Sequence, residues 1–171
     1  MILKNYYMKD AMLIIILIFV SSCSWLHPKY SSDQEGRLLP DINLILEDNK
    51  SGFNTSSITS GKPFIIFLYH PYCPYCRAQT AEILKNIGSL QDIRLYMISA
   101  DPDSLINQYS NLYRLNKYSN IILARDSTDL FGDYFKVPGV PYLAFYDKQK
   151  KLKQVLLGKY DFKAIKDILI N

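Results

Sequence analysis

The feature that most constrains this chain is a pair of cysteines three positions apart. Residues 69–77 read YHPYCPYCR and contain Cys73 and Cys76, with prolines before and between the two cysteines. Such a pair is a redox couple, one half of a metal site, or two small residues of a hydrophobic core. The pattern of strands and helices around the pair decides between these interpretations.

Strands are predicted from apolar runs of strand length. Residues 64–69 form a continuous apolar run, which is typical of a central strand that is covered on both faces. Similar runs predict three more long strands and two short ones, at residues 93–98, 142–146, 152–157, 42–46 and 121–123. The last two long strands are separated only by residues 147–151, a connection short enough for a hairpin.

Helices are predicted between these strands. Residues 76–88 carry apolar residues on one side and close on a glycine, the pattern of an amphipathic helix with its C-cap. Asp101, Pro102 and Asp103 fit the N-cap, first position and first turn of a second helix that runs to about Leu115. Two further helices are expected at residues 127–135 and 161–170.

The cysteine pair therefore lies where the first central strand gives way to its helix, and this placement favours redox chemistry. A cysteine at a helix N-terminus faces unpaired backbone N–H groups and the positive end of the helix dipole, which together stabilise a thiolate. We expect Cys73 to be this nucleophile, with Pro74 at the first helical position. Cys76, about one turn further on, is expected to attack Cys73 and resolve the mixed disulfide.

A metal site would need more ligands than this stretch supplies. Structural zinc is commonly held by four ligands from two paired motifs, whereas this chain has one pair, preceded by His70. A copper-binding module that holds a soft ion such as Cu(I) with His70, Cys73 and Cys76 stays open as the alternative function. The redox interpretation requires no bound cofactor and no metal.

The N-terminus has the layout of a secretory signal peptide. Lys4 and Lys9 precede an apolar run of ten residues, at 11–20, which is shorter than the ~20 residues that a membrane-spanning helix needs. Residues 20–23, Val-Ser-Ser-Cys, resemble a bacterial lipobox, in which the cysteine is lipidated and becomes the new N-terminus. This resemblance implies that Cys23 anchors the mature protein to a membrane.

Three regions are therefore expected. Residues 1–22 form a lipoprotein-type signal peptide, residues 23–36 a lipid-anchored tether without periodicity, and residues 37–171 one domain large enough to bury a core. The net charge of +4 for the whole chain is too mild, and too evenly spread, for a nucleic-acid partner.

With the CPYC motif in place, the chain resembles thioredoxin-fold proteins, and among them the TlpA-like, membrane-anchored thiol-disulfide oxidoreductases. The resemblance covers residues 37–171. It rests on three segments besides the cysteines: LPDI at 39–42, GKPFII at 61–66 and VPGVPY at 137–142. It implies an α/β, thioredoxin-like fold, in which a central mixed sheet is flanked by helices and preceded by an N-terminal extension.

The resemblance also implies roles for residues near the cysteines. The bond between Val140 and Pro141 is expected to be cis and to lie beside the CPYC motif, where Val140 offers backbone groups to the substrate. Tyr72 and Tyr75 are expected to shape the rim that contacts the substrate. Independently of the resemblance, His70 is either a candidate for tuning the pKa of the nucleophile, because a nearby imidazolium would stabilise a thiolate, or an exposed polar residue of the turn.

The implied activity is thiol-disulfide exchange in the bacterial cell envelope, facing the periplasm. The partners would be client proteins with cysteines or disulfides, the membrane through Cys23, and a membrane redox partner. Reduction of clients is the favoured direction. One departure concerns Phe67, since some relatives carry a buried acid at this place. Without that acid, the proton of Cys76 must leave through water, another side chain or the substrate.

Overall fold

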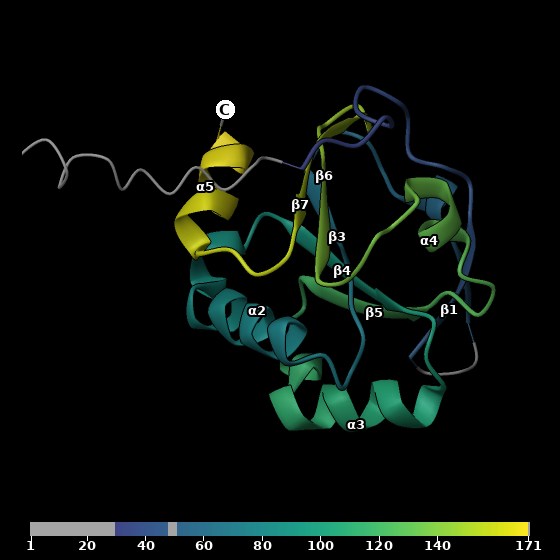
Figure 1. Ribbon diagram of the computed structural model, residues 1–171, viewed down its shortest axis with the longest axis vertical. Coiled ribbons are helices and arrows are strands. Elements are labelled where there is room, and N and C mark those ends of the chain that lie inside the picture. The colour runs from purple at the N-terminus through teal and green to yellow at the C-terminus, as the bar shows by residue number, and fades with distance from the viewer. Residues whose placement is uncertain (1–29, 48–50, 171) are drawn as a thin grey trace, which may run out of the picture.

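A computed structural model describes residues 30–47 and 51–170, which form one β-sheet with helices on both faces (Figure 1). The strands are β1 (Asn43–Leu46), β2 (Gly52–Asn54), β3 (Phe64–Leu68), β4 (Arg94–Ser99), β5 (Ile121–Arg125), β6 (Tyr142–Tyr146) and β7 (Leu152–Leu157). The helices are α2 (Pro74–Lys85), α3 (Asp103–Tyr113), α4 (Leu130–Phe135) and α5 (Phe162–Ile170), with short 3-10 helices at Thr55–Ser57, Ile87–Leu90 and Leu115–Lys117.

The sheet has seven strands in the order β2-β1-β5-β4-β3-β6-β7. β3 lies near its middle, parallel to β4 and antiparallel to β6, and β4 is also parallel to β5. The remaining pairs are antiparallel. Parallel strands end at the same edge of a sheet, so the connections that follow β3 and β4 meet there. The antiparallel β6 begins at this edge, which brings three separate connections together.

Two hydrophobic clusters fill the two sides of the sheet, because successive side chains of a strand point to opposite faces. Ile65 and Phe67 of β3 face the cluster that α2, α3 and α5 cover. Phe64 and Ile66 face the other cluster, which α4 covers. All residues of β3 are buried, which explains why its sequence is continuously apolar. The predicted mixed α/β architecture is confirmed.

The end of α2 differs from the prediction. The helix ends at Lys85 and its C-cap is Asn86, whose backbone N–H bonds to the carbonyls of Ile83 and Leu84. Gly88 lies instead inside the 3-10 helix Ile87–Leu90. This tighter helix carries Leu90 into the core, where it is almost completely buried. The apolar periodicity correctly predicted a helix here, but Gly88 is not its C-cap.

Residues 30–36, which composition places in a tether, pack against the domain. The ring of Tyr30 lies edge-on to the ring of Tyr142, with centroids 6.0 Å apart. The backbone N–H of Gly36 donates to the carbonyl of Leu152 at 2.7 Å. These contacts are made across the fold, so the local sequence pattern does not reveal them.

The expected signal peptide at residues 1–22 and the lipidation site Cys23 lie outside the described residues. Within residues 30–47 and 51–170, no helix is both long enough and apolar enough to cross a membrane.

Candidate active site

The connection from β3 to α2 places both cysteines at the carboxyl edge of the central strands. Cys73 is the N-cap of α2, and Pro74 occupies the first position of the helix, as the sequence predicted. The Sγ atom of Cys73 accepts the backbone N–H of Cys76 at 3.3 Å, the kind of bond that a capping side chain makes. The sulfur therefore lies at the positive end of the helix.

The two sulfurs differ in their surroundings. Cys76 is 0% exposed and belongs to the cluster under α2, whereas Cys73 is partly exposed at the rim of that cluster, and both are free thiols. Burial raises the pKa of the Cys76 thiol well above its ordinary value, because its thiolate would lose hydration. A reagent from solution therefore meets Cys73 first.

The start of β6 closes the site on the other side. The peptide bond between Val140 and Pro141 is cis, as the resemblance implied. The Cys73 thiol donates to the carbonyl oxygen of Val140 at 3.5 Å. The resemblance also implies that Val140 and Pro141 bind the substrate, and the structure places the carbonyl of Val140 beside the sulfur of Cys73.

Both ring nitrogens of His70 have partners. Nδ1 accepts the backbone N–H of Tyr72 at 3.1 Å, and Nε2 lies 3.3 Å from Oδ1 of Asp101. The other oxygen of Asp101 accepts the hydroxyl of Ser99 at 2.6 Å. The expected capping role of Asp101 is wrong, because α3 begins at Asp103 with Pro102 as its N-cap.

Two tyrosines flank Cys73 on the surface. Tyr72 is 60% exposed and Tyr75 is 66% exposed. The ring of Tyr72 has two neighbours: the centroid of the His70 ring lies 5.9 Å from its own, and the guanidinium carbon of Arg77 also lies 5.9 Å from its centroid. Nε of Arg77 donates to the carbonyl of Pro71 at 2.9 Å, which holds this cation against the turn. Both tyrosines are therefore exposed beside Cys73, and their expected contact with the substrate stays a prediction.

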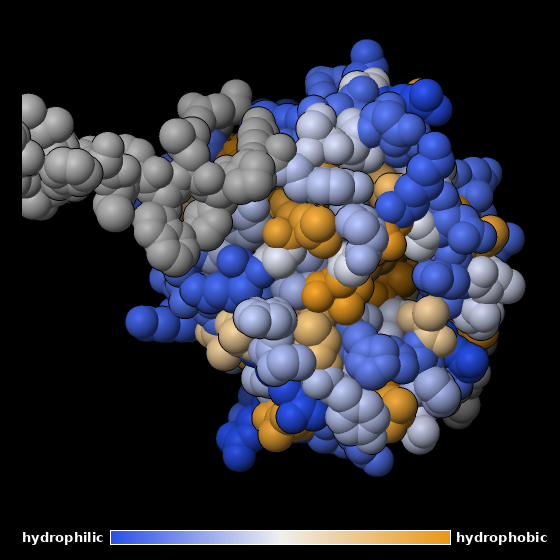
Figure 2. Space-filling model, viewed as in Figure 1, coloured by the Kyte–Doolittle hydropathy of each residue, from blue (hydrophilic) through white to orange (hydrophobic). Residues whose placement is uncertain are grey.

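An open groove of about 530 Å³ begins at Val140 and runs towards α4. In Figure 2, apolar surface gathers around a hollow on this face. The groove combines apolar and ionisable side chains, which are Leu68, Ile98, Phe131, Val137, His70, Asp101, Asp126, Asp129, Asp133 and Lys136. Burial, together with the carboxylates of Asp126 and Asp133, raises the pKa of Asp129.

Behind Cys76, a tyrosine of α3 contacts the start of α2. The hydroxyl of Tyr109 donates to the carbonyl of Cys76 at 3.3 Å and shares a 2.7 Å hydrogen bond with the hydroxyl of Thr80. Burial raises the pKa of Tyr109, so it stays a neutral hydrogen-bond donor. Sequence reasoning missed this residue, because a tyrosine on an amphipathic helix carries no signal beyond core packing.

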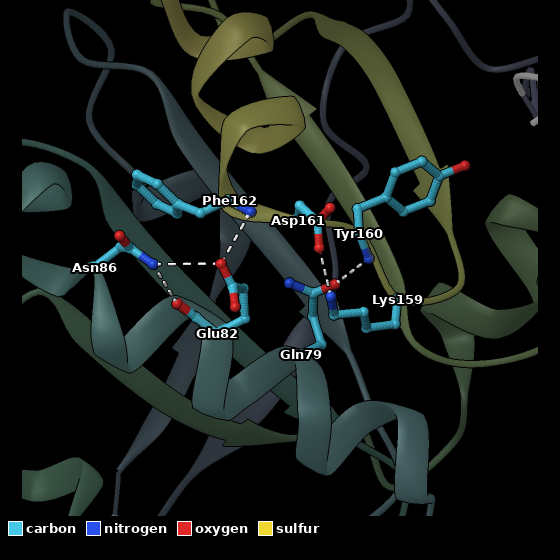
Figure 3. A network of polar contacts seen from close by, with 7 residues as sticks. All are labelled: Gln79, Glu82, Asn86, Lys159, Tyr160, Asp161 and Phe162. Carbon is cyan, nitrogen blue, oxygen red and sulfur yellow. Dashed lines mark hydrogen bonds and ion pairs between the residues drawn. The ribbon is translucent and has the colours of Figure 1, made fainter. Parts of the chain in front are cut away.

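Further along, α2 is tied to the connection between β7 and α5 (Figure 3). The side-chain oxygen of buried Gln79 accepts the backbone N–H of Tyr160 at 2.7 Å. Glu82 accepts the backbone N–H of Phe162, the first residue of α5, at 3.2 Å. The helix that begins between the cysteines is thus bound to the connection that follows β7 as well as packed on the core.

The copper hypothesis finds no support in the positions of the side chains. Within the described residues, no three His, Cys, Asp or Glu side chains are close enough together to hold a metal ion. Both ring nitrogens of His70 are already engaged, by the N–H of Tyr72 and by Asp101. His70, Cys73 and Cys76 are neighbours in sequence without forming a ligand set.

Comparisons with known proteins agree with this arrangement. Residues 36–155 match the AhpC/TSA family. The chain is 24% identical over 162 residues to the thiol:disulfide interchange protein DsbE of Pseudomonas aeruginosa. This alignment covers 91% of the present chain and 85% of that protein.

Solved structures share the fold at low sequence identity. A secreted Mycobacterium tuberculosis disulfide oxidoreductase homologous to E. coli DsbE matches with a TM-score of 0.65 and 15% identity, over 76% of this chain and 95% of that one. The thioredoxin domain of a thiol-disulfide oxidoreductase from Bacteroides vulgatus gives 0.63 and 18%, over 79% and 97%. These likenesses confirm the expected thioredoxin-like fold.

Proposed function

Because the chain belongs to the AhpC/TSA family, we propose that it acts on client proteins as a thiol-disulfide oxidoreductase through Cys73 and Cys76. The interchange protein DsbE, to which the chain is similar, carries this activity in its name. One observation supports the assignment to these residues most strongly. A partly exposed sulfur caps a helix and faces the carbonyl of Val140, with a second, buried sulfur one turn behind it.

The first step is attack by the Cys73 thiolate on one sulfur of a client disulfide. A bond forms between Cys73 and that sulfur, and the other client sulfur leaves as a thiolate that takes up a proton. In the second step, the Cys76 thiolate attacks Sγ of Cys73 and displaces the client. The client gains two electrons and two protons, and the enzyme is left with a disulfide between Cys73 and Cys76.

Surrounding groups have complementary parts in this proposal. The carbonyl of Val140 lies beside the sulfur that would carry the client, so an extended client segment would pair with the chain there. Tyr72 and Tyr75 supply exposed aromatic surface for the same segment. When its own ring is protonated, His70 would favour the thiolate of Cys73, because a nearby imidazolium stabilises a negative charge.

We further propose that the protein works in the cell envelope as a TlpA-like lipoprotein and that it reduces its clients. The similarity to a DsbE protein supports an extracytoplasmic place, and the lipobox-like residues before Cys23 support an anchor. A reductant in this compartment needs electrons from a membrane partner, because its surroundings keep cysteines oxidised.

The activity is tested by mixing the fully reduced protein with insulin and following the loss of the insulin disulfides. We expect one insulin disulfide to be reduced for each protein molecule that forms the Cys73–Cys76 bond. The variant Cys73→Ser should be inactive although it folds. Equal reduction by wild type and by Cys73→Ser would refute the assignment of Cys73.

A further inference from the structure

The carboxylate of Asp101 contacts two elements at the edge of the site. Oδ2 accepts the hydroxyl of Ser99, the last residue of β4, and Oδ1 faces Nε2 of His70 in the turn before α2. The side chain of Asp101 is only 16% exposed. Asp101 caps no helix. The contacts of its carboxylate with Ser99 and His70 are therefore the interactions that could give this side chain a role.

The hydrogen bonds of His70 define its tautomer. Nδ1 accepts the backbone N–H of Tyr72, so this nitrogen carries no proton. A neutral imidazole then carries its proton on Nε2, the atom that faces Asp101. An ionised carboxylate only accepts hydrogen bonds, and therefore favours this tautomer. Without Asp101, the other tautomer could form, and its Nδ1–H would meet the N–H of Tyr72, donor against donor.

The turn stabilised in this way presents Cys73. The carbonyl of His70 accepts the N–H of Cys73 at 3.0 Å. Two residues lie between His70 and Cys73 in this turn: Nδ1 of His70 accepts the backbone N–H of Tyr72, and Nε of Arg77 donates to the carbonyl of Pro71. The orientation of the His70 ring thus affects the backbone directly before the helix start where the sulfur lies.

We propose that Asp101 is a positioning residue for Cys73, and that it acts by fixing the tautomer of His70. This rests on the proposed function of Cys73 as the nucleophile and deepens it. Ser99 supports the arrangement, because its bond to Oδ2 keeps Oδ1 turned towards the ring. The end of β4 is thereby connected to the turn that carries the nucleophile.

Other charged groups near the ring stand further from it. Asp126, Asp129, Asp133 and Lys136 also line the groove, and Arg77 packs on the ring of Tyr72. In the described part of the chain, Asp101 alone lies within ion-pair distance of His70. A contribution from the charge of Asp101 itself is the competing explanation, and it predicts a different pH profile.

The test compares Asp101→Ala in two backgrounds, wild type and His70→Asn. Asparagine at position 70 can accept the N–H of the residue two positions on, as in an Asx turn, and it has no tautomer to fix. Single-turnover reduction of insulin is measured across a range of pH on both sides of neutrality. Alkylation of Cys73 over the same range gives the midpoint of its ionisation.

We expect Asp101→Ala to lower the plateau rate about fivefold in the wild-type background, the size expected for one lost hydrogen bond. In the His70→Asn background the same change should have no effect, whatever rate that background has. The midpoint of Cys73 alkylation should stay in place. An equal loss in both backgrounds, no loss in wild type, or a shifted midpoint would each overturn the proposal.

Two further variants separate positioning from a general loss of structure. Asp101→Asn should recover most of the rate, because its oxygen can accept from His70 while its amide donates to Ser99. Asp103→Asn removes a carboxylate two residues away that pairs with Arg125 at 3.4 Å, and it should leave the rate unchanged. If reduction did not depend on Cys73 at all, the proposed function would fail instead, which Cys73→Ser reveals independently.

Discussion

Cys73 and Cys76 are the same kind of amino acid and lie within one helical turn, yet their surroundings give their thiols different chemistry. Cys73 is partly exposed and bonded to one backbone donor and one backbone acceptor. Cys76 is buried among apolar side chains of β3 and α3. Since a thiolate is the reactive form and needs either water or donors, the exposed sulfur is suited to begin the reaction and the buried one to finish it.

The first prediction follows from this difference. Cys76→Ser should accumulate mixed disulfides between Cys73 and client proteins, because no sulfur remains to displace the client. Non-reducing gels of alkylation-quenched cells, followed by identification of the trapped peptides, provide the measurement. Cys73→Ser is the control and should trap nothing. Trapping by the Cys73 variant alone would reverse the two roles.

The second prediction concerns pH. The folded protein raises the pKa of Cys76, so the reduced fold binds this proton more tightly than the unfolded chain does. The resulting stability is present below the pKa of an unfolded cysteine, about 8.5, and is lost as pH rises from there towards the raised value. The melting temperature of the reduced protein should therefore fall in alkaline solution.

Cys76→Ala supplies the comparison, because it keeps the tyrosines and lysines that also titrate at high pH. The difference in melting temperature between the reduced wild type and this variant should shrink as the pH rises above about 8.5. A constant difference across the alkaline range would mean that Cys76 ionises as easily in the fold as in the unfolded chain.

At the scale of residues, the sequence predicted that Cys73 and Pro74 begin the helix, and missed the side chains that hold the turn before it. Cys73 and Pro74 are recognisable because spacing and proline chemistry mark them locally, whereas the cis bond at Pro141 was implied by the resemblance to thioredoxin-fold proteins. Asp101 was interpreted as a helix cap from its place before Pro102 and Asp103. Its true partner, His70, is far away in sequence. A side chain that acts across two connections leaves no local pattern to read.

Among the elements, α2 is the one on which the site depends, and it is held at both ends. Its first turn contacts Tyr109 of α3. Its last turns contact the connection that leads into α5, through Gln79 and Glu82. Glu82 accepts one of the backbone N–H groups that the first turn of α5 cannot satisfy internally. A side chain of α2 therefore caps α5.

The third prediction tests this connection. Glu82→Ala should lower the free energy of unfolding by about 1 kcal/mol, the usual cost of losing a cap. Glu82→Gln should lose less, because its amide oxygen can still accept from Phe162. Thermal or denaturant unfolding measures both. Neither variant should change the rate at which Cys73 is alkylated, and a changed rate would show that the α5 end of the helix influences the nucleophile.

Helix boundaries show the limit of prediction for elements. The helix expected at 127–135 begins only at Leu130, because the carboxylate of Asp126 accepts the N–H of Phe131 at 2.7 Å. The residues between Asp126 and Leu130 therefore form a turn. The carboxylate of Asp126 thus binds an N–H of the first turn of α4, and the helix starts three residues later than the sequence pattern predicts. Propensity alone could not place a boundary that a buried carboxylate sets.

For the whole molecule, the order of long strands and helices was predictable, since each is a continuous apolar or amphipathic segment. The edge strand β2 was not predictable. β2 spans only Gly52–Asn54 and has no apolar run of its own. It is held by pairing with β1 and by Phe53, whose ring stacks on Tyr96 at 5.8 Å. Such a strand forms because of tertiary contacts, which the local sequence pattern does not reveal.

The fourth prediction concerns attachment of the whole molecule to a membrane. Cys23→Ser should release the protein into the soluble fraction, because lipid chains on this residue are the proposed anchor. Disulfide exchange by the released protein should continue, since the proposed site residues all lie between positions 70 and 141. Fractionation of cells followed by the insulin assay measures both. Retention of the variant in membranes would indicate an uncleaved apolar segment instead.

The last prediction concerns the direction of electron flow. A strong oxidant of this fold type stabilises its reduced form, and a helix N-terminus contributes to that by binding the thiolate. In this structure, Sγ of Cys73 accepts one backbone N–H, from Cys76, but also faces the carbonyl oxygen of Val140. An acceptor beside the sulfur disfavours the negative charge. The reduced form therefore gains little stability from its thiolate, which suits a protein that reduces its clients.

By the thermodynamic cycle of folding and oxidation, such a protein is more stable with its disulfide closed than open. If its potential lies about 60 mV below that of the unfolded pair, the difference in stability is about 2.8 kcal/mol, or about 10 °C in melting temperature. We expect the oxidised protein to melt higher than the reduced one. Val140→Ala retains the backbone carbonyl and should preserve the order. A reduced form that melts higher would make the protein an oxidant of its clients, and Cys73 and Cys76 would then transfer a disulfide outward rather than receive one.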